Sequence, residues 1–429
     1  MNVALSGGAP LRGELRVPGD KSIAHRALIF GSLAHGWTRI AGLPRGEDVA
    51  STIRALGTLG VAISRNDESA IVMGRGPDAL DARGADVDCG NSGTTMRLLM
   101  GALAGGRTRV RLTGDASLSK RPMRRVSGPL AELGARVHLA LGDRAPLEVE
   151  GTPLAGANCE LKLPSAQVKS ALLLAALRAR GTTRLTGMLD SRDHTERMLP
   201  MFGARLESRD GEIVVEGGQR LRGAFVRVPG DASSAAFWIA AGSVVPGALL
   251  RLRDVGVNPT RLGFVRALTR MGAKISVLPL AREGEPVADI TVEYAPLHAI
   301  ELTAADVPDL IDELPLLAVV ATQATGRTVV RGASELRVKE SDRIEAVARF
   351  LRAMGATIET FDDGFAIEGP QALHGAKVQP QDDHRIAMAG AVAGLVATGE
   401  TIVADAECAS VSYPEFFDTL GQLAGQARR

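Results

Sequence analysis

The chain repeats one outline of residues six times, and this repeat restricts its fold more than any other feature. Each copy begins with a turn or small polar residues, continues into a run rich in Ala, Gly, Leu and Val, and closes near a glycine. The copies begin at Arg16, Cys89, Lys162, Arg227, Asp306 and Gln381. A second helical outline alternates with the first, and five of its six copies end at a Gly that can cap a helix. These patterns predict six copies of one supersecondary module, each with two helices and intervening strands.

The two helical outlines differ in where their polar residues fall. The first is apolar on nearly every face, as in "ALLLAALRARG", which is typical of a buried helix. The second has a polar face and should lie outside. We therefore predict an α/β fold with buried helices surrounded by sheets. A solenoid is the alternative, although modules of roughly seventy residues are long for a solenoid repeat.

The segment "RVPGD" occurs at residues 16–20 and again at 227–231, with three modules between the copies and three after the second. A Pro-Gly-Asp turn is a plausible place for the chain to cross between domains. The sequence thus predicts one domain over residues 19–230 and a discontinuous domain over 1–18 plus 231–429, with hinges near Pro18–Asp20 and Pro229–Asp231. The first strand precedes the first crossing, so we expect it to complete the C-terminal domain.

Composition narrows the class of function. The 429 residues carry a net charge of +1, so no overall field attracts nucleic acid or an acidic membrane. Aromatic residues make up only 3%, which argues against base-stacking platforms, and the apolar runs are too short to span a bilayer. The N-terminus lacks a signal-peptide pattern, and the three cysteines have neither disulfide-scaffold nor zinc-site spacing. We expect a cytoplasmic location.

Basic residues gather where the helical outlines begin. A cation in the first turn opposes the helix dipole by a few tenths of a kcal/mol, so it needs a reason. Scattered surface charge explains any single case, but recurrence at equivalent repeat positions favours an anion-binding site for phosphate or carboxylate groups. The residues concerned are Lys21, Arg26, Arg97, Arg121, Lys169, Arg192 and Arg385.

Candidate acids and bases lie close to these cations in the sequence. For Asp342 and Asp383 we favour helix capping, a role to which Asp is well suited. Asp312 and Glu313 are adjacent carboxylates at the edge of an apolar run, which capping alone does not explain. His384 is either a general base or a structural hydrogen-bonding residue.

Eight motifs in order along the chain resemble the 5-enolpyruvylshikimate-3-phosphate synthase family, more its bacterial branch called class II than its enteric type. They are "PGDKSIAHRAL", "GNSGTTMR", "LTGDASLSKRPM", "SAQVKSALLLAAL", "SRDHTERML", "PGDASSAAF", "LRVKESDRI" and "DHRIAMA". The resemblance implies two domains of three βαβαββ units each. It also implies transfer of the carboxyvinyl group of phosphoenolpyruvate to the 5-hydroxyl of shikimate 3-phosphate, through a tetrahedral intermediate, with release of phosphate. No metal or organic cofactor is expected, and we expect a monomer whose domains close on the substrates.

The resemblance also implies roles for individual residues. Lys21 would lie between the two substrates, Asp312 would be the base for the 5-hydroxyl, and Glu340 would donate a proton to the methylene carbon. Shikimate 3-phosphate would further contact Ser22, Arg26, Ser165, Ala166, Gln167, Arg192 and Lys339. Phosphoenolpyruvate would further contact Gly93, Arg121, Gln167, Arg343 and Arg385.

The chain departs from the family pattern in a few places. Glu335 stands where the enteric type has Asn, Ala166 replaces a second Ser, and "SVSYPEFF" lacks an expected Lys. Gly93 lacks the methyl group of some glyphosate-tolerant members, so we expect the enzyme to be a glyphosate target. Two alternatives remain at this stage. One is a UDP-N-acetylglucosamine enolpyruvyl transferase, whose first motif normally reads more like "GAKNA"; the other is a non-catalytic repeat protein that binds anions.

Overall fold

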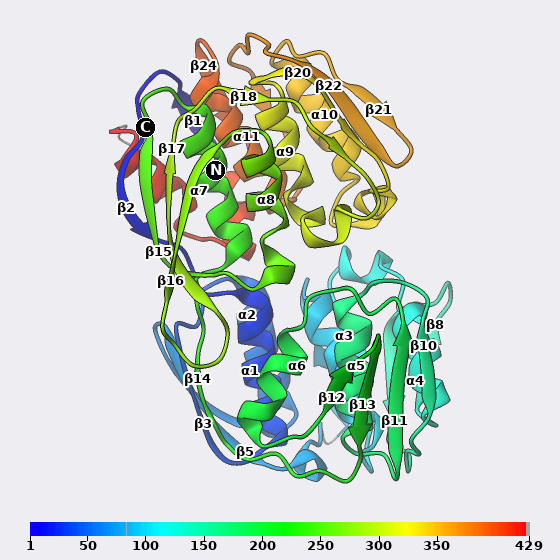
Figure 1. Cartoon of the computed structure of the whole chain (residues 1–429). Coiled ribbons are helices and arrows are strands. Elements are labelled where there is room, and N and C mark those ends of the chain that lie inside the picture. The colour runs from blue at the N-terminus through cyan, green and yellow to red at the C-terminus, as the bar shows by residue number, and fades with distance from the viewer. Residues whose placement is uncertain (83, 426–429) are drawn as a thin grey trace. The chain divides into compact units, whose positions relative to one another are not determined.

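The computed structural model describes residues 1–82 and 84–425, which form two compact units (Figure 1). The continuous unit comprises Gly19–Val228, and the discontinuous unit comprises Met1–Pro18 and Pro229–Arg429. Both boundaries fall within the two Pro-Gly-Asp segments. Each unit has its own hydrophobic core.

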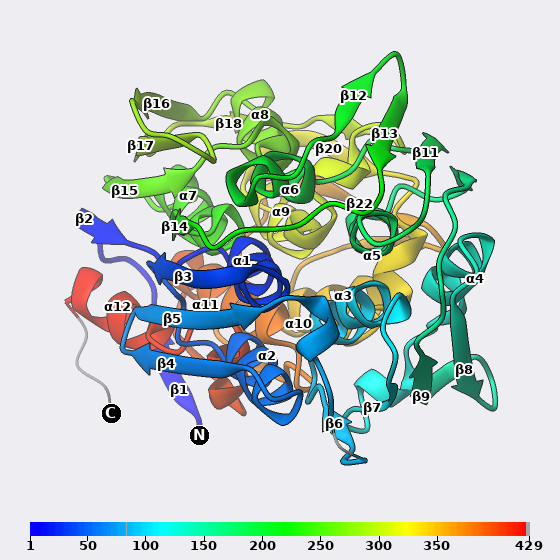
Figure 2. The same ribbon diagram turned by 90° about the horizontal axis from the view of Figure 1, so that it is seen from below.

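The described residues form six sheets, three in each unit. Those of the continuous unit have the strand orders β14-β3-β5-β4, β6-β7-β9-β8 and β10-β11-β13-β12. The strands are β3 (His35–Ala41), β4 (Ala62–Asn66), β5 (Ser69–Arg75), β6 (Val87–Asp88), β7 (Arg109–Thr113), β8 (Arg136–Ala140), β9 (Arg144–Glu150), β10 (Asn158–Leu161), β11 (Thr182–Gly187), β12 (Glu207–Arg209), β13 (Glu212–Glu216) and β14 (Phe225–Arg227). Figure 2 shows the first of these sheets along one side of α1 and α2.

The sheets of the discontinuous unit have the orders β2-β15-β17-β16, β18-β20-β22-β21 with β19 also on β20, and β1-β24-β23. Their strands are β1 (Val3–Ser6), β2 (Arg12–Arg16), β15 (Leu249–Gly256), β16 (Lys274–Leu280), β17 (Val287–Glu293), β18 (Leu297–His298), β19 (Glu301–Leu302), β20 (Ala324–Val330), β21 (Glu359–Phe361), β22 (Gly364–Gly369), β23 (Lys377–Val378) and β24 (Glu400–Val403).

Five of the six modules share one topology. The first strand runs parallel to the second, as β6 does to β7, and a buried helix directly precedes the second strand. An outer helix follows, and then a hairpin whose second strand pairs antiparallel with the second strand of the module, as β9 does with β7. The sixth module departs from the expected βαβαββ pattern. Among the described residues no hairpin follows its outer helix, and β1 instead pairs antiparallel with β24, on the edge that a hairpin strand holds elsewhere.

Two strands reach their sheets from distant parts of the chain. β2 pairs in parallel with β15, and β14 pairs in parallel with β3, so each supplies the first strand of a module whose remaining elements are far away in sequence. With β1, β2 completes sheets of the discontinuous unit. The first strand had been expected to complete the domain of the C-terminal modules.

The apolar helices are the buried ones, as their sequences predicted. Nearly all of their residues are buried: α1 (Lys21–Leu33), α3 (Gly93–Ala104), α5 (Ala166–Ala176), α7 (Ala232–Val244), α9 (Leu314–Ala321) and α11 (His384–Val396). Close approach between them requires small residues. A Cβ on Gly101 of α3 would lie 2.0 Å from the carbonyl oxygen of Ala171 in α5. Within the described residues, no helix is both long and apolar enough to cross a membrane.

The outer helices have one polar face, and most end at a glycine. They are α2 (Glu47–Thr58), α4 (Arg124–Glu132), α6 (His194–Met198), α8 (Gly263–Arg270), α10 (Arg343–Ala353) and α12 (Phe416–Leu423). The five glycines expected as caps, which are Gly60, Gly134, Gly203, Gly272 and Gly355, have φ between 82° and 94°. This left-handed conformation costs glycine little, which explains the residue at these positions.

Candidate active site

In the continuous unit the predicted residues lie where three buried helices begin. Side chains cap all three helices, because Asp20 accepts the N–H of Ile23, Ser92 that of Thr95, and Ser165 that of Val168. Lys21 and Ser22 then open α1, Gly93 opens α3, and Ala166 and Gln167 open α5. The remaining backbone N–H groups of a first turn have no intrahelical acceptor and are suited to binding an anion.

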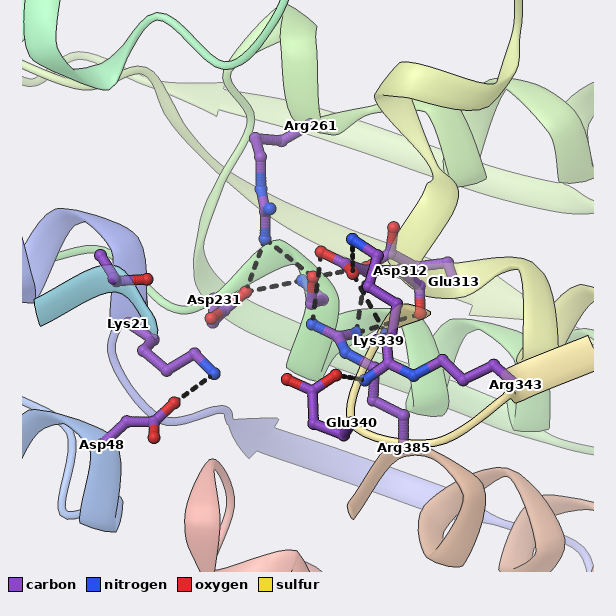
Figure 3. Close-up of polar contacts among 12 residues, drawn as sticks. Lys21, Asp48, Asp231, Arg261, Asp312, Glu313, Lys339, Glu340, Arg343 and Arg385 are labelled. Atoms are coloured by element: carbon purple, nitrogen blue, oxygen red, sulfur yellow. Dashed lines mark hydrogen bonds and ion pairs between the residues drawn. The ribbon is translucent and has the colours of Figure 1, made fainter. Parts of the chain in front are cut away.

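Lys21 has a carboxylate partner that the sequence analysis did not identify. Its Nζ lies 2.8 Å from Oδ2 of Asp48 on α2 (Figure 3), and both side chains are partly exposed. Together with the Asp20 cap, this carboxylate compensates for the unfavourable position of a cation at the start of α1. The ammonium group is therefore held in place while keeping part of its surface accessible.

Arg26 is buried, with 2% of its surface exposed, and is held mainly by side chains of two other helices. Its Nε donates to Oγ1 of Thr195 at 2.8 Å and its Nη2 to Oγ of Ser170 at 2.7 Å. Its Nη1 donates to the carbonyl oxygen of Ser22 at 2.9 Å. These three acceptors are neutral oxygens, and together they fix the orientation of the guanidinium.

Three residues predicted for phosphoenolpyruvate gather around Arg97, a residue that the family resemblance did not assign. Arg97 donates to Oε1 of Gln167 at 2.5 Å, and a Cβ on Gly93 would lie 3.0 Å from its Nη1 and 3.4 Å from Nη1 of Arg121. Arg121 also donates to Oδ1 of Asn91 at 2.7 Å. Two guanidinium groups thus lie beside a helix start at which no side chain projects from Gly93.

Arg192 lies in the loop between β11 and α6, two residues before the helix. The buried Lys169 of α5 holds this loop, because its Nζ donates to the carbonyl oxygens of Leu189 at 3.0 Å and Ser191 at 3.2 Å and pairs with Glu196 at 2.7 Å. Lys169 therefore supports the loop that carries Arg192. Its position near the start of a buried helix, where the repeats place basic residues, is explained by this structural role.

In the discontinuous unit a single guanidinium joins the predicted base and the predicted proton donor. Arg343 is 1% exposed, and its Nη1 lies 3.3 Å from Oδ1 of Asp312 and its Nη2 2.7 Å from Oε2 of Glu340 (Figure 3). Its Nε donates to Oδ2 of Asp383 at 2.8 Å. The arrangement fixes three carboxylates around one cation.

The charges of this cluster stabilise one another. Burial by itself lowers the pKa of Arg343, but the carboxylates of Asp383, Glu340 and Asp312 outweigh burial and hold that pKa above its ordinary value. Burial likewise raises the pKa of Asp383, and the charge of Arg343 outweighs it, so the pKa of Asp383 lies below its usual range. Both groups are consequently ionised near neutral pH.

Two further cations face Asp312, which lies in a short 3₁₀ turn (Ile311–Glu313) before α9. The Nζ of Lys339 is 3.6 Å from its Oδ1, and Nη2 of Arg385 is 3.8 Å from its Oδ2. Arg385 also donates to Oε1 of Glu313 at 3.4 Å. The Oε1 of Glu313 in turn accepts a hydrogen bond from Ser233. Glu313 therefore holds Arg385, which explains the adjacent carboxylates of the sequence.

Asp342 and Asp383 both cap helices, as predicted, and Asp383 has a second role as well. Asp342 accepts the N–H of Glu345 and begins α10, while Asp383 accepts the N–H of Arg385 and begins α11. Asp383 additionally binds Arg343, a contact between residues 40 positions apart that a capping motif does not reveal.

The three aromatic residues of the segment "SVSYPEFF" pack in the core. Tyr413 is buried beside Trp238, whose indole N–H donates to its hydroxyl at 3.2 Å, and burial raises the pKa of Tyr413 to about 12. Phe416 and Phe417 are buried in the same cluster. Glu335 lies in a 3₁₀ turn, Ser334–Val338, that leads to Lys339.

Comparison with known proteins identifies the class first. Two solved structures described as EPSP synthase from Acinetobacter baumannii match with TM-scores of 0.88 and 0.87, at 39% and 37% identity, and cover 99% or more of this chain and 98% or more of theirs. The fold is thus the two-domain α/β fold of the enolpyruvyl transferases.

Sequence comparison then identifies the family. The model of EPSP synthase (3-phosphoshikimate 1-carboxyvinyltransferase) matches residues 5–420. The 3-phosphoshikimate 1-carboxyvinyltransferases of Synechococcus sp. (strain RCC307) and Anaeromyxobacter sp. (strain Fw109-5) are 50% and 51% identical. The alignments cover 98% and 96% of this chain and 99% and 96% of those proteins. The chain belongs to the EPSP synthase family of transferases. This finding confirms the resemblance seen in the motifs. It does not favour a UDP-N-acetylglucosamine enolpyruvyl transferase or a non-catalytic anion-binding repeat protein.

Proposed function

We propose that the protein transfers the carboxyvinyl group of phosphoenolpyruvate to the 5-hydroxyl of shikimate 3-phosphate, giving 5-enolpyruvylshikimate 3-phosphate and phosphate. The observation that carries the proposal is the contact of Arg343 with both Asp312 and Glu340, which holds two carboxylates ready for proton transfer in one cluster. Family membership supplies the reaction to which such a pair is suited.

The substrates of this reaction are polyanions, and the cations at the helix starts are suited to them. Lys21 contacts both substrates in this proposal. The further residues proposed to bind shikimate 3-phosphate are Ser22, Arg26, Ser165, Ala166, Gln167, Arg192, Asp312 and Lys339. The further residues proposed to bind phosphoenolpyruvate are Gly93, Gln167, Arg121, Arg343 and Arg385. Guanidinium groups bind phosphate and carboxylate through paired N–H donors, which matches their frequency in this set.

The proton transfers follow from the chemistry of addition and elimination. Glu340 donates a proton to C3 of phosphoenolpyruvate, which gives C2 cationic character. The 5-hydroxyl oxygen attacks C2 while Asp312 accepts its proton, and a tetrahedral adduct forms. The Glu340 carboxylate then removes a proton from the new methyl group, the double bond reforms, and the bond from C2 to the phosphate oxygen breaks. An acid that later acts as a base works best with a pKa near the operating pH.

Phosphate release tests the proposed function directly. The purified protein should release phosphate when both phosphoenolpyruvate and shikimate 3-phosphate are present, and not with either alone. Turnover with UDP-N-acetylglucosamine in place of shikimate 3-phosphate would instead identify the other enolpyruvyl transferase. Binding of both substrates without turnover would support a non-catalytic anion-binding protein.

We further propose that the protein acts as a cytoplasmic monomer without a metal or organic cofactor. The three cysteines have neither disulfide-scaffold nor zinc-site spacing, which supports the location and the absence of a zinc site, while the family resemblance supports a reaction without an organic cofactor. Full activity after dialysis against a chelator and a solution mass near 44.9 kDa would agree with this proposal. A dimeric mass, or activity restored only by added metal, would contradict it.

A further inference from the structure

Four buried side chains of the continuous unit form an uninterrupted chain of hydrogen bonds. Nδ1 of His25 lies 2.6 Å from Oγ1 of Thr52, and that oxygen lies 2.6 Å from Oγ1 of Thr95. Thr95 then donates to Oγ of Ser92 at 2.7 Å. Each of the four residues is at most 1% exposed. The chain joins α1, α2 and α3, and none of its members was assigned a role above beyond the helix cap of Ser92.

The direction of the hydrogen bonds follows from the count of protons. The single hydroxyl proton of Thr95 goes to Ser92, so Thr95 does not donate to Thr52. The acceptors near the hydroxyl proton of Thr52 are then Thr95 at 2.6 Å and the carbonyl oxygen of Asp48 at 3.4 Å. Thr52 then has no proton left for His25, and Nδ1 of His25 must be the donor. Burial supports this neutral form, because it lowers the pKa of His25 to about 3. The imidazole is therefore fixed as the Nδ1–H tautomer, with Nε2 unprotonated.

The two ends of the chain lie next to different parts of the site. His25 directly precedes Arg26 on α1, whereas Ser92 caps α3 immediately before Gly93. We propose that His25 is a positioning residue which, through Thr52 and Thr95, fixes Ser92 and thereby orients the start of α3 toward phosphoenolpyruvate. This inference rests on the proposed function, since that function assigns Gly93 to phosphoenolpyruvate.

Loss of the chain should affect one substrate more than the other. Arg26 is held by Thr195, Ser170 and the carbonyl group of Ser22, none of which belongs to the chain. The Ser92 hydroxyl, by contrast, is oriented by Thr95, which the rest of the chain fixes. Breaking the chain at His25 should therefore weaken phosphoenolpyruvate binding and leave shikimate 3-phosphate binding nearly unchanged.

A matched pair of variants tests the role of the donor. Asn and Leu have the same branched shape, but only Asn places an N–H donor at the δ position occupied by Nδ1 of His25. For His25→Leu we expect KM for phosphoenolpyruvate to rise about tenfold, which is the loss of roughly one buried hydrogen bond. For His25→Asn we expect a change below about twofold, and KM for shikimate 3-phosphate should move by less than that in both variants. Equal impairment of both variants, or an equal rise in both KM values, would overturn the proposal.

A second break in the chain separates positioning from a general loss of stability. Thr52→Val removes the hydroxyl at nearly constant shape and should raise KM for phosphoenolpyruvate as His25→Leu does. The double variant should be no worse than the poorer single variant, because both changes break the same chain. Additive effects would contradict a shared route. Urea midpoints of all variants identify any that fail to fold, and in that case the remaining variant decides the question.

Nuclear magnetic resonance of ¹⁵N-labelled histidine tests the geometry without any substrate. The Nδ1–H tautomer of His25 should be present in the wild-type protein and unchanged between pH 5 and pH 8, given its lowered pKa. An Nε2–H tautomer would overturn the inferred direction of the chain. Wild-type protein that releases no phosphate would refute the proposed function and the substrate assignment together, whereas unchanged KM values in active variants would refute the positioning role alone.

Discussion

Each unit contains a buried arginine near the start of a helix, but the two arginines have different surroundings. Hydroxyl and carbonyl oxygens hold Arg26 in the continuous unit, whereas carboxylates surround Arg343 in the discontinuous unit. The neutral oxygens orient the Arg26 guanidinium, which the proposed function assigns to the anion shikimate 3-phosphate. A guanidinium surrounded by carboxylates instead holds them in place around one positive charge. The difference indicates a division between an arginine that serves anion binding and an arginine that also positions the carboxylates proposed for proton transfer.

The largest expected effect tests the proton-transfer half of this division. Glu340→Gln removes the proposed proton donor at constant shape, so kcat for phosphate release should fall by about 10²–10⁴-fold. Arg26→Met should act mainly on KM for shikimate 3-phosphate. Glu359→Gln, at an exposed pair with Arg327, is the control and should leave both constants unchanged. Equal losses of kcat in the Glu340 and Arg26 variants would break the comparison.

The stability of the two arginine variants sharpens the contrast. Arg343→Met leaves buried Asp383 without its main cation and should lower the free energy of unfolding by about 3–5 kcal/mol. Arg26→Met leaves neutral acceptors unpaired and should cost about 1–3 kcal/mol. Urea denaturation at pH 7 measures both values. The comparison fails if Arg26→Met proves the more destabilising change.

Acid should reveal the lowered pKa of Asp383. Because the folded-state pKa lies below the unfolded value of about 3.9, ionised Asp383 stabilises the folded state above that pH, and the contribution is lost as pH falls through the folded pKa. Asp383→Asn keeps a good helix cap and should cost about 1.5–3 kcal/mol at pH 7. Urea midpoints between pH 6 and pH 2.5 should show the two proteins converging in acid. A constant difference at every pH would exclude the charge of Asp383 as its cause.

The smallest expected effect concerns the helix start beside Arg97 and Arg121. In Gly93→Ala the new methyl group would lie 3.0 Å from Nη1 of Arg97, so we expect KM for phosphoenolpyruvate to rise about fivefold. Glyphosate should inhibit the wild-type enzyme at submillimolar concentration and the variant more weakly. Gly57→Ala on α2 is the matched control, since its Cβ meets no atom within 4 Å. An unchanged KM in Gly93→Ala would contradict this prediction, because it would show that the side chains of Arg97 and Arg121 move to accommodate the methyl group at little cost.

Local patterns in the sequence were sufficient for much of the fold. Apolar runs predicted the buried helices, and the glycines with positive φ closed the outer helices where spacing placed them. These features depend on residues within one or two turns of each other. The sixth module differs because β1 pairs with β24, about four hundred residues away, and no local pattern specifies such a pairing.

The site shows the same limit. The Asp342 cap could be predicted, because its acceptor and the N–H it binds are three residues apart. The partners Lys21–Asp48 and Arg343–Asp383 join different elements, and charge in a sequence does not reveal which charges meet. Arg97 carried a usable signal, namely its place at a helix start in the repeat, but the family resemblance gave it no role. Glu313 likewise stood out only as an unexplained neighbour of Asp312.

The pairing of β1 and β2 with late strands has a consequence for synthesis on the ribosome. The continuous unit is complete once residue 228 has emerged, since β14 is its last strand. β2 can pair only after β15 has been synthesised, and β1 only after β24, near residue 400. Until then the backbone groups of β1 and β2 lack these strand partners. The nascent chain therefore carries β2 unpaired until β15 has been made, and β1 unpaired until β24 has been made. The continuous unit, which is completed earlier, lies between these two strands and their partners in the sequence.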